Sequence, residues 1–384
     1  MKRLINAFLF LITLVVLFEA YLLISHNLYI NNVLKDTIFK GKLGPSIDNY
    51  SDFAFRKIKA ETPQKWSVSK RYNQYEFTQE QQDYFEKHQS VAYLVIHQDS
   101  IIQENYWDIG AIDSRTNSFS AAKTIVSILI GIAIEEGHIK SVNQKLSYFL
   151  PEYYSGSEIR LKDLLTMSSG IDFDENYINP FSFPAQSYYG FDLKKHTYSY
   201  LQKDMPGKVW RYRGGDTQLL AFVLEKATGM KIADYATAKL WNFIGAEQDA
   251  FWSLDVENGD EKASCCFISN ARDFARIGKL YLNKGNWDGH QLVNKTFVEE
   301  SIKPASYLRD EFGNINSKYG YQWWIMEHQG NNVFYARGIL GQYIFVIPEK
   351  DLIVVRLGHK RQKVDGEDHP RDVKKYLDYA LEIL

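Results

Sequence analysis

A serine and a lysine stand three residues apart at the start of an apolar stretch, as Ser120 and Lys123. On a helix, this spacing places the hydroxyl and the ammonium on the same face. A lysine that enters a buried helix loses hydration, which favours the neutral amine and makes it a possible proton acceptor. The N-terminal end of a helix also favours developing negative charge. A serine there, with an amine one turn away, is a sensible activated nucleophile.

The element that would hold this pair is a helix with a broad apolar face. Apolar residues follow Lys123 at helical spacing, namely Ile125, Ile128, Leu129, Ile132 and Ala133. The pattern predicts a helix that is buried on most sides and ends near Gly137. Ser-x-x-Lys alone is a weak signal, because a serine before an apolar helix is often only an N-cap.

Length and composition narrow the class of protein. The chain has 384 residues, 45% of them hydrophobic and 15% aromatic, which is enough for one large domain or two closely packed ones. The formal net charge is −2, so nothing indicates a nucleic-acid partner. The nine histidines form no zinc-binding pattern, and we expect neither a metal nor a cofactor. The absence of Gly-x-Ser-x-Gly argues against an α/β-hydrolase.

The N-terminus is apolar over residues 4–24, apart from Asn6, Thr13 and Glu19. This stretch is long enough to span a bilayer. Lys2 and Arg3 would stay in the cytoplasm, so the rest of the chain would be periplasmic or on the cell surface. No small-x-small cleavage site follows. We therefore expect an uncleaved signal anchor over 1–25, with a cleaved signal peptide as the alternative.

The remainder of the chain divides into a spacer and a main domain. Residues 26–75 are polar and mixed, but they contain apolar side chains that can be buried: Tyr50, Phe53, Phe55, Ile58 and Trp66. We expect a spacer that packs on the domain. Residues 76–384 would form the catalytic domain, with a helical insertion over about 125–300.

Alternation and turn residues predict strands at both ends of this domain. An early hairpin is expected over 91–97 and 101–107, after a short helix over 79–89. Late strands are expected over 321–326, 333–337, 341–347 and 352–357, before a closing helix over 371–384. If the two groups pair, the chain ends meet in one sheet. The fold class is therefore α+β, an antiparallel sheet flanked by helices plus a mostly helical subdomain.

Helical spacing also predicts amphipathic helices over 159–170, 217–229 and 270–282. Residues 171–209 are rich in aromatic residues without a strong period, and we expect an irregular stretch at a cleft. Asp273 lies near a helix start, where a carboxylate suits the helix dipole, and is expected to be structural. Cys265 and Cys266 are adjacent. Outside the cytoplasm they could form a disulfide, but we favour two reduced residues on opposite faces of an extended segment.

Several motifs occur together in an order that resembles a known family. They are Ser120-Ala-Ala-Lys123, Leu165-Thr-Met-Ser-Ser-Gly170, Tyr212-Arg-Gly-Gly-Asp-Thr-Gln-Leu-Leu220 and Ala336-Arg-Gly-Ile-Leu-Gly-Gln342. The chain resembles the serine β-lactamase and penicillin-binding-protein superfamily over roughly residues 40–384. The resemblance is to the class C-like branch, which includes esterases, D-amino-acid peptidases and 6-aminohexanoate-dimer hydrolases. It implies a β-lactamase/transpeptidase-like fold.

The resemblance implies roles for individual residues. Ser120 would be the acylated nucleophile and Lys123 its base partner. Tyr212 would share the proton and pass it to the leaving group. From the residues alone, Tyr212 is more simply a core aromatic.

The last motif would border the cleft. The family carries Lys-Thr-Gly or His-x-Gly at this strand, so Arg337 and Gly338 would contact substrate. The backbone N–H groups of Ser120 and Ile339 would form the oxyanion hole.

Two departures from the family pattern bear on substrate. Gly214 replaces the usual asparagine of Tyr-x-Asn, and Ala336 replaces the lysine of Lys-Thr-Gly. Both missing groups normally hold a β-lactam, so we do not expect efficient β-lactamase activity. We expect an exported serine hydrolase of small linear amides, or of carboxylic esters. The alternatives are a β-lactamase-like module that binds cell-wall peptides or a partner protein, and a true penicillin-binding protein or β-lactamase.

Overall fold

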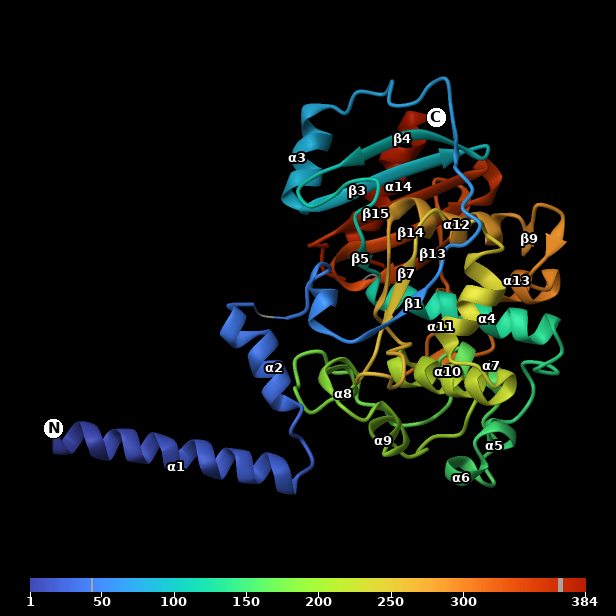
Figure 1. Ribbon diagram of the computed structural model, residues 1–384. Helices are drawn as coiled ribbons and strands as arrows, with labels where there is room; N and C mark the ends of the chain where they lie inside the picture. The colour runs from blue at the N-terminus through green and yellow to red at the C-terminus, as the bar shows by residue number, and fades with distance from the viewer. Residues whose placement is uncertain (43, 365–368) are drawn as a thin grey trace.

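The computed structural model describes residues 1–42, 44–364 and 369–384, and a seven-stranded sheet lies at its centre (Figure 1). The strand order is β12-β13-β14-β15-β3-β4-β2. The bounds are β2 Ser67–Val68, β3 Ser90–His97, β4 Ser100–Tyr106, β12 Trp324–His328, β13 Asn331–Gly338, β14 Gln342–Ile347 and β15 Leu352–Gly358. All neighbours are antiparallel except β2 and β4. This confirms the α+β prediction.

The predicted meeting of the chain ends occurs at the pair β15 and β3, where Val354 lies opposite Val95. The hairpin between β3 and β4 turns at Gln98 and Asp99, whose φ angles of 46° and 62° are those of a tight hairpin turn. Strand β12 begins three residues later than predicted, because Tyr321 and Gln322 form a turn that contacts α4.

Each face of the sheet buries a separate core, which explains why β3 is apolar at nearly every position. Tyr93 and Val95 face a cluster with α3 (Gln79–Lys87) and α14 (Arg371–Ile383). Ala92, Leu94 and Ile96 face the larger cluster, which contains α4 (Ala122–Glu135) and α12 (Ala271–Leu282). The Ser120 helix thus lies in the main core, and Gly137 follows its end with a φ of 79°.

A helical part covers the far side of α4. The longest of its helices, α10 (Gly214–Thr228), packs directly against α4. The shorter helices are α5 Leu146–Phe149, α6 Pro151–Tyr154, α7 Leu161–Leu165, α8 Phe183–Tyr189, α9 Leu193–Tyr198, α11 Ile232–Ala236 and α13 Lys295–Ser301. Smaller sheets are formed by β1 (Phe55–Ile58), β7 (Ala250–Ser253), β8 (Phe267–Ser269) and β5 (Thr116–Asn117), by β6 (Val209–Trp210) with β11 (Arg309–Asp310), and by β9 (Asn286–Trp287) with β10 (His290–Gln291).

Two sequence predictions for this part were wrong in detail. Helix α7 is shorter than 159–170. The Arg160 N–H donates to the Asp163 carboxylate and caps the helix start at Leu161, and the chain leaves the helix after Leu165. Residues 171–209 are not wholly irregular, because they contain α8 and α9. Those helices have only six or seven residues each, which is too few to show a helical period. Their conformation is fixed by tertiary packing, such as the ring contact between Phe173 and Phe183.

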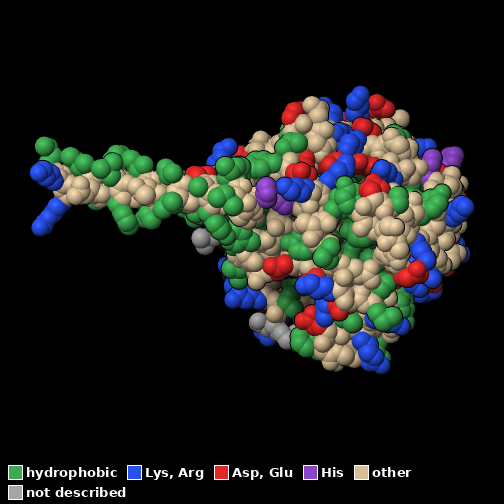
Figure 2. Space-filling view, turned by 90° about the horizontal axis from the view of Figure 1, so that it is seen from below, with side chains coloured by type: hydrophobic (Ala, Val, Ile, Leu, Met, Phe, Trp, Pro, Cys, Tyr) green, Lys and Arg blue, Asp and Glu red, His purple; other side chains and the backbone are tan. Residues whose placement is uncertain are grey.

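The N-terminal helix α1 (Lys2–Ile24) projects from the body with its apolar side chains exposed (Figures 1 and 2). By length and composition it could cross a membrane, since its 23 residues extend about 34 Å. The chain then forms α2 (Ile30–Asp36) and a 3₁₀ turn over Ile38–Lys40. In the segment that follows, Ile58 and Trp66 are buried in the main core, whereas Phe55 is exposed.

Arg356 fixes the turn after β13, where Ile339 is expected to contribute to an oxyanion hole. Its buried guanidinium donates to the carbonyls of His88, Leu340, Gly341 and Lys360. We expect Arg356→Leu to lower the free energy of unfolding by about 3 kcal/mol or more, because it leaves these buried acceptors unpaired. Thermal unfolding of the full chain in detergent tests this. The exposed Arg309→Leu is the control, and an equal effect of both variants would contradict the prediction.

Candidate active site

The predicted serine–lysine pair meets at the start of α4. A 3₁₀ turn over Phe119–Ala121 runs directly into the helix. The Lys123 Nζ lies 3.1 Å from the Ser120 Oγ, and it also donates to the Ser264 carbonyl at 2.5 Å. Lys123 is buried, whereas Ser120 is half-buried. The hydroxyl is therefore open to a substrate while its amine partner is withdrawn from water.

The residue before Ser120 has an unusual backbone conformation. Phe119 is buried and has a φ of 45°, in the left-handed region that side chains rarely adopt. Its N–H donates to the Asn117 side chain at 2.9 Å, and the Ser118 N–H donates to the Phe267 carbonyl at 2.9 Å. These bonds hold the turn, so the strained residue is Phe119, directly before Ser120, and strain of this kind is found at functional sites.

Tyr212 reaches the pair from the segment before α10. The Lys123 Nζ lies 5.3 Å from the centroid of the Tyr212 ring, and the ring also packs against Trp324. Met167 holds this segment, because its carbonyl accepts from the Arg211 N–H at 3.0 Å and its sulfur from the Arg213 N–H at 3.3 Å. The turn that contains Met167 therefore positions the segment that contains Tyr212. As a result, Ser120, Lys123 and Tyr212 come together.

A buried polar pair fastens the same two motifs. The Ser169 Oγ donates to the Asp216 Oδ1 at 2.6 Å. Burial raises the pKa of the Asp216 carboxyl to about 8, although the Ser169 bond opposes the shift. Asp216 follows Tyr212 in the first turn of α10, so this buried pair ties the start of α10 to the Ser169 turn.

This shift makes stability depend on pH. The folded protein retains a proton on Asp216 that the unfolded chain releases near pH 4, so the free energy of unfolding falls as pH rises from about 4 to 8. Asp216→Asn removes this dependence. We expect its Tm relative to the unmodified protein to rise by about 5 °C or more between pH 5 and pH 8. The exposed Asp83→Asn is the control, and parallel Tm curves for Asp216→Asn would contradict the assignment.

A cavity of about 210 Å³ adjoins Ser120 and Lys123. Ile339 lines it as well, from the turn after β13. A Cβ at Gly338 would lie 2.2 Å from the Ser118 carbonyl oxygen, so glycine lets the end of β13 approach the serine turn. Arg337 does not line this cavity among the described residues; its guanidinium carbon is 3.2 Å from the centroid of the Trp324 ring, which packs against Tyr212.

Sequence reasoning missed Glu175. Its carboxylate accepts from the Gly214 N–H at 2.7 Å and from the Tyr177 hydroxyl at 2.8 Å. Burial raises the pKa of Glu175, and the nearby Lys123 charge opposes this. Glu175 lines the cavity and also a neighbouring hollow of about 610 Å³ that Tyr212 lines. An acidic residue in an aromatic stretch without a period carried no signal that could have singled it out.

Cys265 and Cys266 form a disulfide, so the preference for a reduced pair was wrong. The segment is a turn rather than extended, since the Cys265 N–H donates to the Lys262 carbonyl at 3.1 Å. Cys266 has a φ of 72°, and the two sulfur atoms therefore meet instead of facing apart. Cys265 lines the cavity next to Ser264, whose carbonyl accepts from Lys123.

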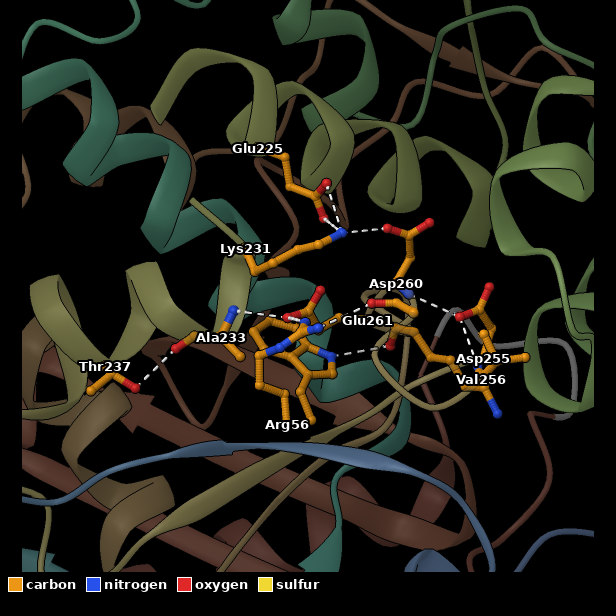
Figure 3. Close-up of polar contacts among 12 residues, drawn as sticks. Arg56, Glu225, Lys231, Ala233, Thr237, Asp255, Val256, Asp260 and Glu261 are labelled. Carbon is orange, nitrogen blue, oxygen red and sulfur yellow. Dashed lines mark hydrogen bonds and ion pairs between the residues drawn. The ribbon is translucent and has the colours of Figure 1, made fainter. Parts of the chain in front are cut away.

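An ion-pair cluster fastens the chain just before this turn (Figure 3). Lys231 lies 2.6 Å from Asp260 and 3.2 Å from Glu225, and Arg56 pairs with Glu261. From α10, the Gln218 side chain also donates to the Glu261 carbonyl at 3.0 Å. The carbonyl that holds Lys123 is thus anchored to the fold only a few residues away.

Within the described residues, no group of three or more metal-binding side chains is present.

Comparison with known proteins identifies the family. A family model described as Beta-lactamase matches residues 78–377. The chain belongs to the beta-lactamase family. A relative from Paenarthrobacter ureafaciens, named 6-aminohexanoate-dimer hydrolase, is 28% identical over 286 residues, which cover 69% of this chain and 71% of the relative. The expected resemblance is confirmed, and the chain is a serine hydrolase of the beta-lactamase family.

Solved structures agree on the fold. A Bacillus anthracis protein provisionally named 6-aminohexanoate-dimer hydrolase has a TM-score of 0.67 at 19% identity, covering 86% of this chain and 90% of that one. A family VIII carboxylesterase has a TM-score of 0.63 at 15% identity, covering 83% and 99%. At these identities the likeness extends to the fold alone.

Proposed function

We propose that this serine hydrolase cleaves an amide or ester through an acyl-enzyme on Ser120. The observation that carries the proposal is the 3.1 Å contact between the Lys123 Nζ and the Ser120 Oγ, beside the Tyr212 ring. A half-buried hydroxyl next to a buried amine and a phenol is a serine nucleophile with two groups available to move its proton.

The reaction would have two steps. The Ser120 Oγ attacks the substrate carbonyl carbon while its proton passes to the Lys123–Tyr212 pair. The backbone N–H groups of Ser120 and Ile339 stabilise the oxyanion. The carbon–nitrogen or carbon–oxygen bond then breaks, and Tyr212 returns the proton to the departing amine or alcohol. Water repeats the attack on the acyl-enzyme, which releases the acid and restores Ser120.

Small linear amides are the first proposed substrates and carboxylic esters the second. The relatives named above are, by name, hydrolases of such bonds. Gly214 and Ala336 stand where the family carries the groups that hold a β-lactam, which favours other acyl groups. Arg337 and Gly338 would border the bound substrate.

We also propose that α1 anchors the enzyme, with residues 26–384 outside the cytoplasm. Lys2 and Arg3 precede the apolar helix, and the disulfide between Cys265 and Cys266 is typical of an oxidising compartment. The chain would then consist of an anchor over 1–25, a spacer over 26–75 and the hydrolase domain over 76–384.

Labelling with a fluorophosphonate tests the proposal. The full chain in detergent should form one covalent adduct, which mass mapping places on Ser120. The adduct should be absent in Ser120→Ala and should form slowly in Lys123→Met. A well-folded sample that forms no adduct would contradict the proposal and favour a binding module with this fold.

A further inference from the structure

The chain that follows the membrane helix forms one wall of the catalytic cavity. Val33 and Thr37, at the end of α2, line the same cavity as Ser120, and so do Gly44 and Pro45. The family match begins only at residue 78. This wall therefore comes from outside the family domain, from the part of the chain nearest the anchor.

The wall is held in place by specific contacts. The Tyr29 hydroxyl donates to the Pro180 carbonyl at 2.9 Å, and the Asn32 side chain donates to the Tyr189 carbonyl at 3.0 Å. Pro180 and Tyr189 are themselves cavity residues. These contacts hold the juxtamembrane segment (residues 26–42, 44 and 45) against α8 and the residues just before it.

The end of the membrane helix is fixed to the same place. Leu22 of α1 is fully buried, in a cluster with Tyr29, Ile30 and Phe119, the residue before the nucleophile. The Asn31 side chain donates to Glu19 of α1 at 2.9 Å. Only residues 25–29 separate the two helices. With α1 across a bilayer, the cavity would lie immediately beyond the membrane surface.

Apolar side chains around this wall face outward. Ile38 and Phe39, next to Thr37, are 66% and 79% exposed, and Ile178 of the opposite wall is 94% exposed. Figure 2 shows the hydrophobic surface of α1 continuing onto the body where the helix joins it. Such surface is costly in water, and next to a membrane helix it fits the interfacial layer of lipid.

The two hollows at the site differ in chemistry. The cavity under the juxtamembrane segment is lined mainly by apolar residues such as Val33, Pro45, Phe183 and Ile339. Its 210 Å³ is less than a whole drug-sized ligand occupies, about 300–1,000 Å³, so it suits one part of a substrate. The hollow on the Tyr212 side is lined by charged residues, including Asp172, Arg211 and Lys318.

We propose that the substrate is an amphiphilic ester or amide that resides at the membrane surface. Its hydrocarbon acyl part enters the cavity beneath the juxtamembrane segment, and its polar leaving group lies in the hollow beside Tyr212. This inference rests on the proposed function and names its substrate class. The anchor then does more than tether the enzyme, because it places the cavity mouth where such acyl chains are concentrated.

A chain-length series tests the cavity. The full chain in phosphatidylcholine nanodiscs is assayed with p-nitrophenyl acetate, butyrate, hexanoate and octanoate. We expect kcat/KM to rise up to about fourfold per methylene until the cavity is filled. Val33→Phe should lower the octanoate-to-acetate ratio of kcat/KM at least about tenfold. A ratio that is flat or falling in the unmodified enzyme, or unchanged by Val33→Phe, would overturn the acyl site.

A second assay tests the membrane position. Each variant is given a fluorogenic oleate ester embedded in phosphatidylcholine vesicles and, separately, soluble p-nitrophenyl butyrate. Phe39→Asp, two residues from the cavity-lining Thr37, should lower the oleate-to-butyrate rate ratio about tenfold, whereas Phe243→Asp, which is also exposed but lies outside the juxtamembrane segment, should not change it. Equal oleate-to-butyrate rate ratios for Phe39→Asp and for Phe243→Asp would overturn the inference. If the unmodified enzyme formed no fluorophosphonate adduct, the proposed function itself would be overturned instead.

Discussion

Ser120→Ala should lower kcat for ester hydrolysis by about 10,000-fold or more, because the variant lacks the hydroxyl that we propose as the nucleophile. The Lys123 amine then has no hydroxyl beside it, although its bond to the Ser264 carbonyl remains. Steady-state kinetics with p-nitrophenyl butyrate measure the loss. The fold should be unaffected, since the Ser120 side chain is half-buried and lies at the edge of a cavity.

Ser118→Ala is the matched control. Ser118 lies two residues earlier, and its buried hydroxyl has only a long contact of 3.4 Å with the Phe119 carbonyl. We expect its kcat to stay within about threefold of the unmodified enzyme. If Ser120→Ala retained a comparable rate, Ser120 would not be the nucleophile.

Lys123→Met should lower kcat by about 100- to 10,000-fold, because the serine loses the amine that we propose as its proton acceptor. Methionine fills a similar volume, so the packing of α4 against α10 should be retained. Tm measured beside kcat separates the two effects, and a variant that is folded but slow is the expected result.

The tyrosine provides an internal comparison. Tyr212→Phe keeps the ring that lies 5.3 Å from the Lys123 Nζ but removes the hydroxyl. If the amine and the phenol share one proton, each variant should also flatten the acid side of the pH–rate profile. A rate for Lys123→Met within about tenfold of the unmodified enzyme would exclude the lysine from proton transfer.

The sequence predicted the parts of the site that depend on local spacing. Ser120 lies in the 3₁₀ turn that leads into α4 and Lys123 in the first turn of α4, so their contact could be predicted from their separation. Tyr212 joins them only through the tertiary packing of its segment on Met167, and the role we propose for it could be anticipated only from the family resemblance.

The parts that escaped prediction are those set by long-range contacts. Glu175 reaches the site because its carboxylate bonds to Gly214, and no local pattern encodes that bond. The Ser264 carbonyl is a backbone group that any residue could supply. The disulfide depended on a turn at 262–266, whereas the sequence there reads equally well as an extended segment.

The same division holds for the fold. The strands around β3 and β15 were predicted closely, because alternation and apolar runs follow directly from burial on two faces. Helices α8 and α9 were not predicted, because six or seven residues cannot show a helical period. Their ring contacts, such as Phe173 with Phe183, decide their conformation.

The wall formed by Val33 and Pro45 has a consequence for sample preparation. Removing an apolar N-terminal helix is a usual first step toward a soluble enzyme, and the family match from residue 78 invites a cut well downstream of α1. Such a cut would open the cavity beside Ser120 to water. A cut between Ser25 and Tyr29 would keep the wall but remove Leu22 from its cluster. Truncated forms would thus differ from the intact enzyme in substrate preference as well as in solubility.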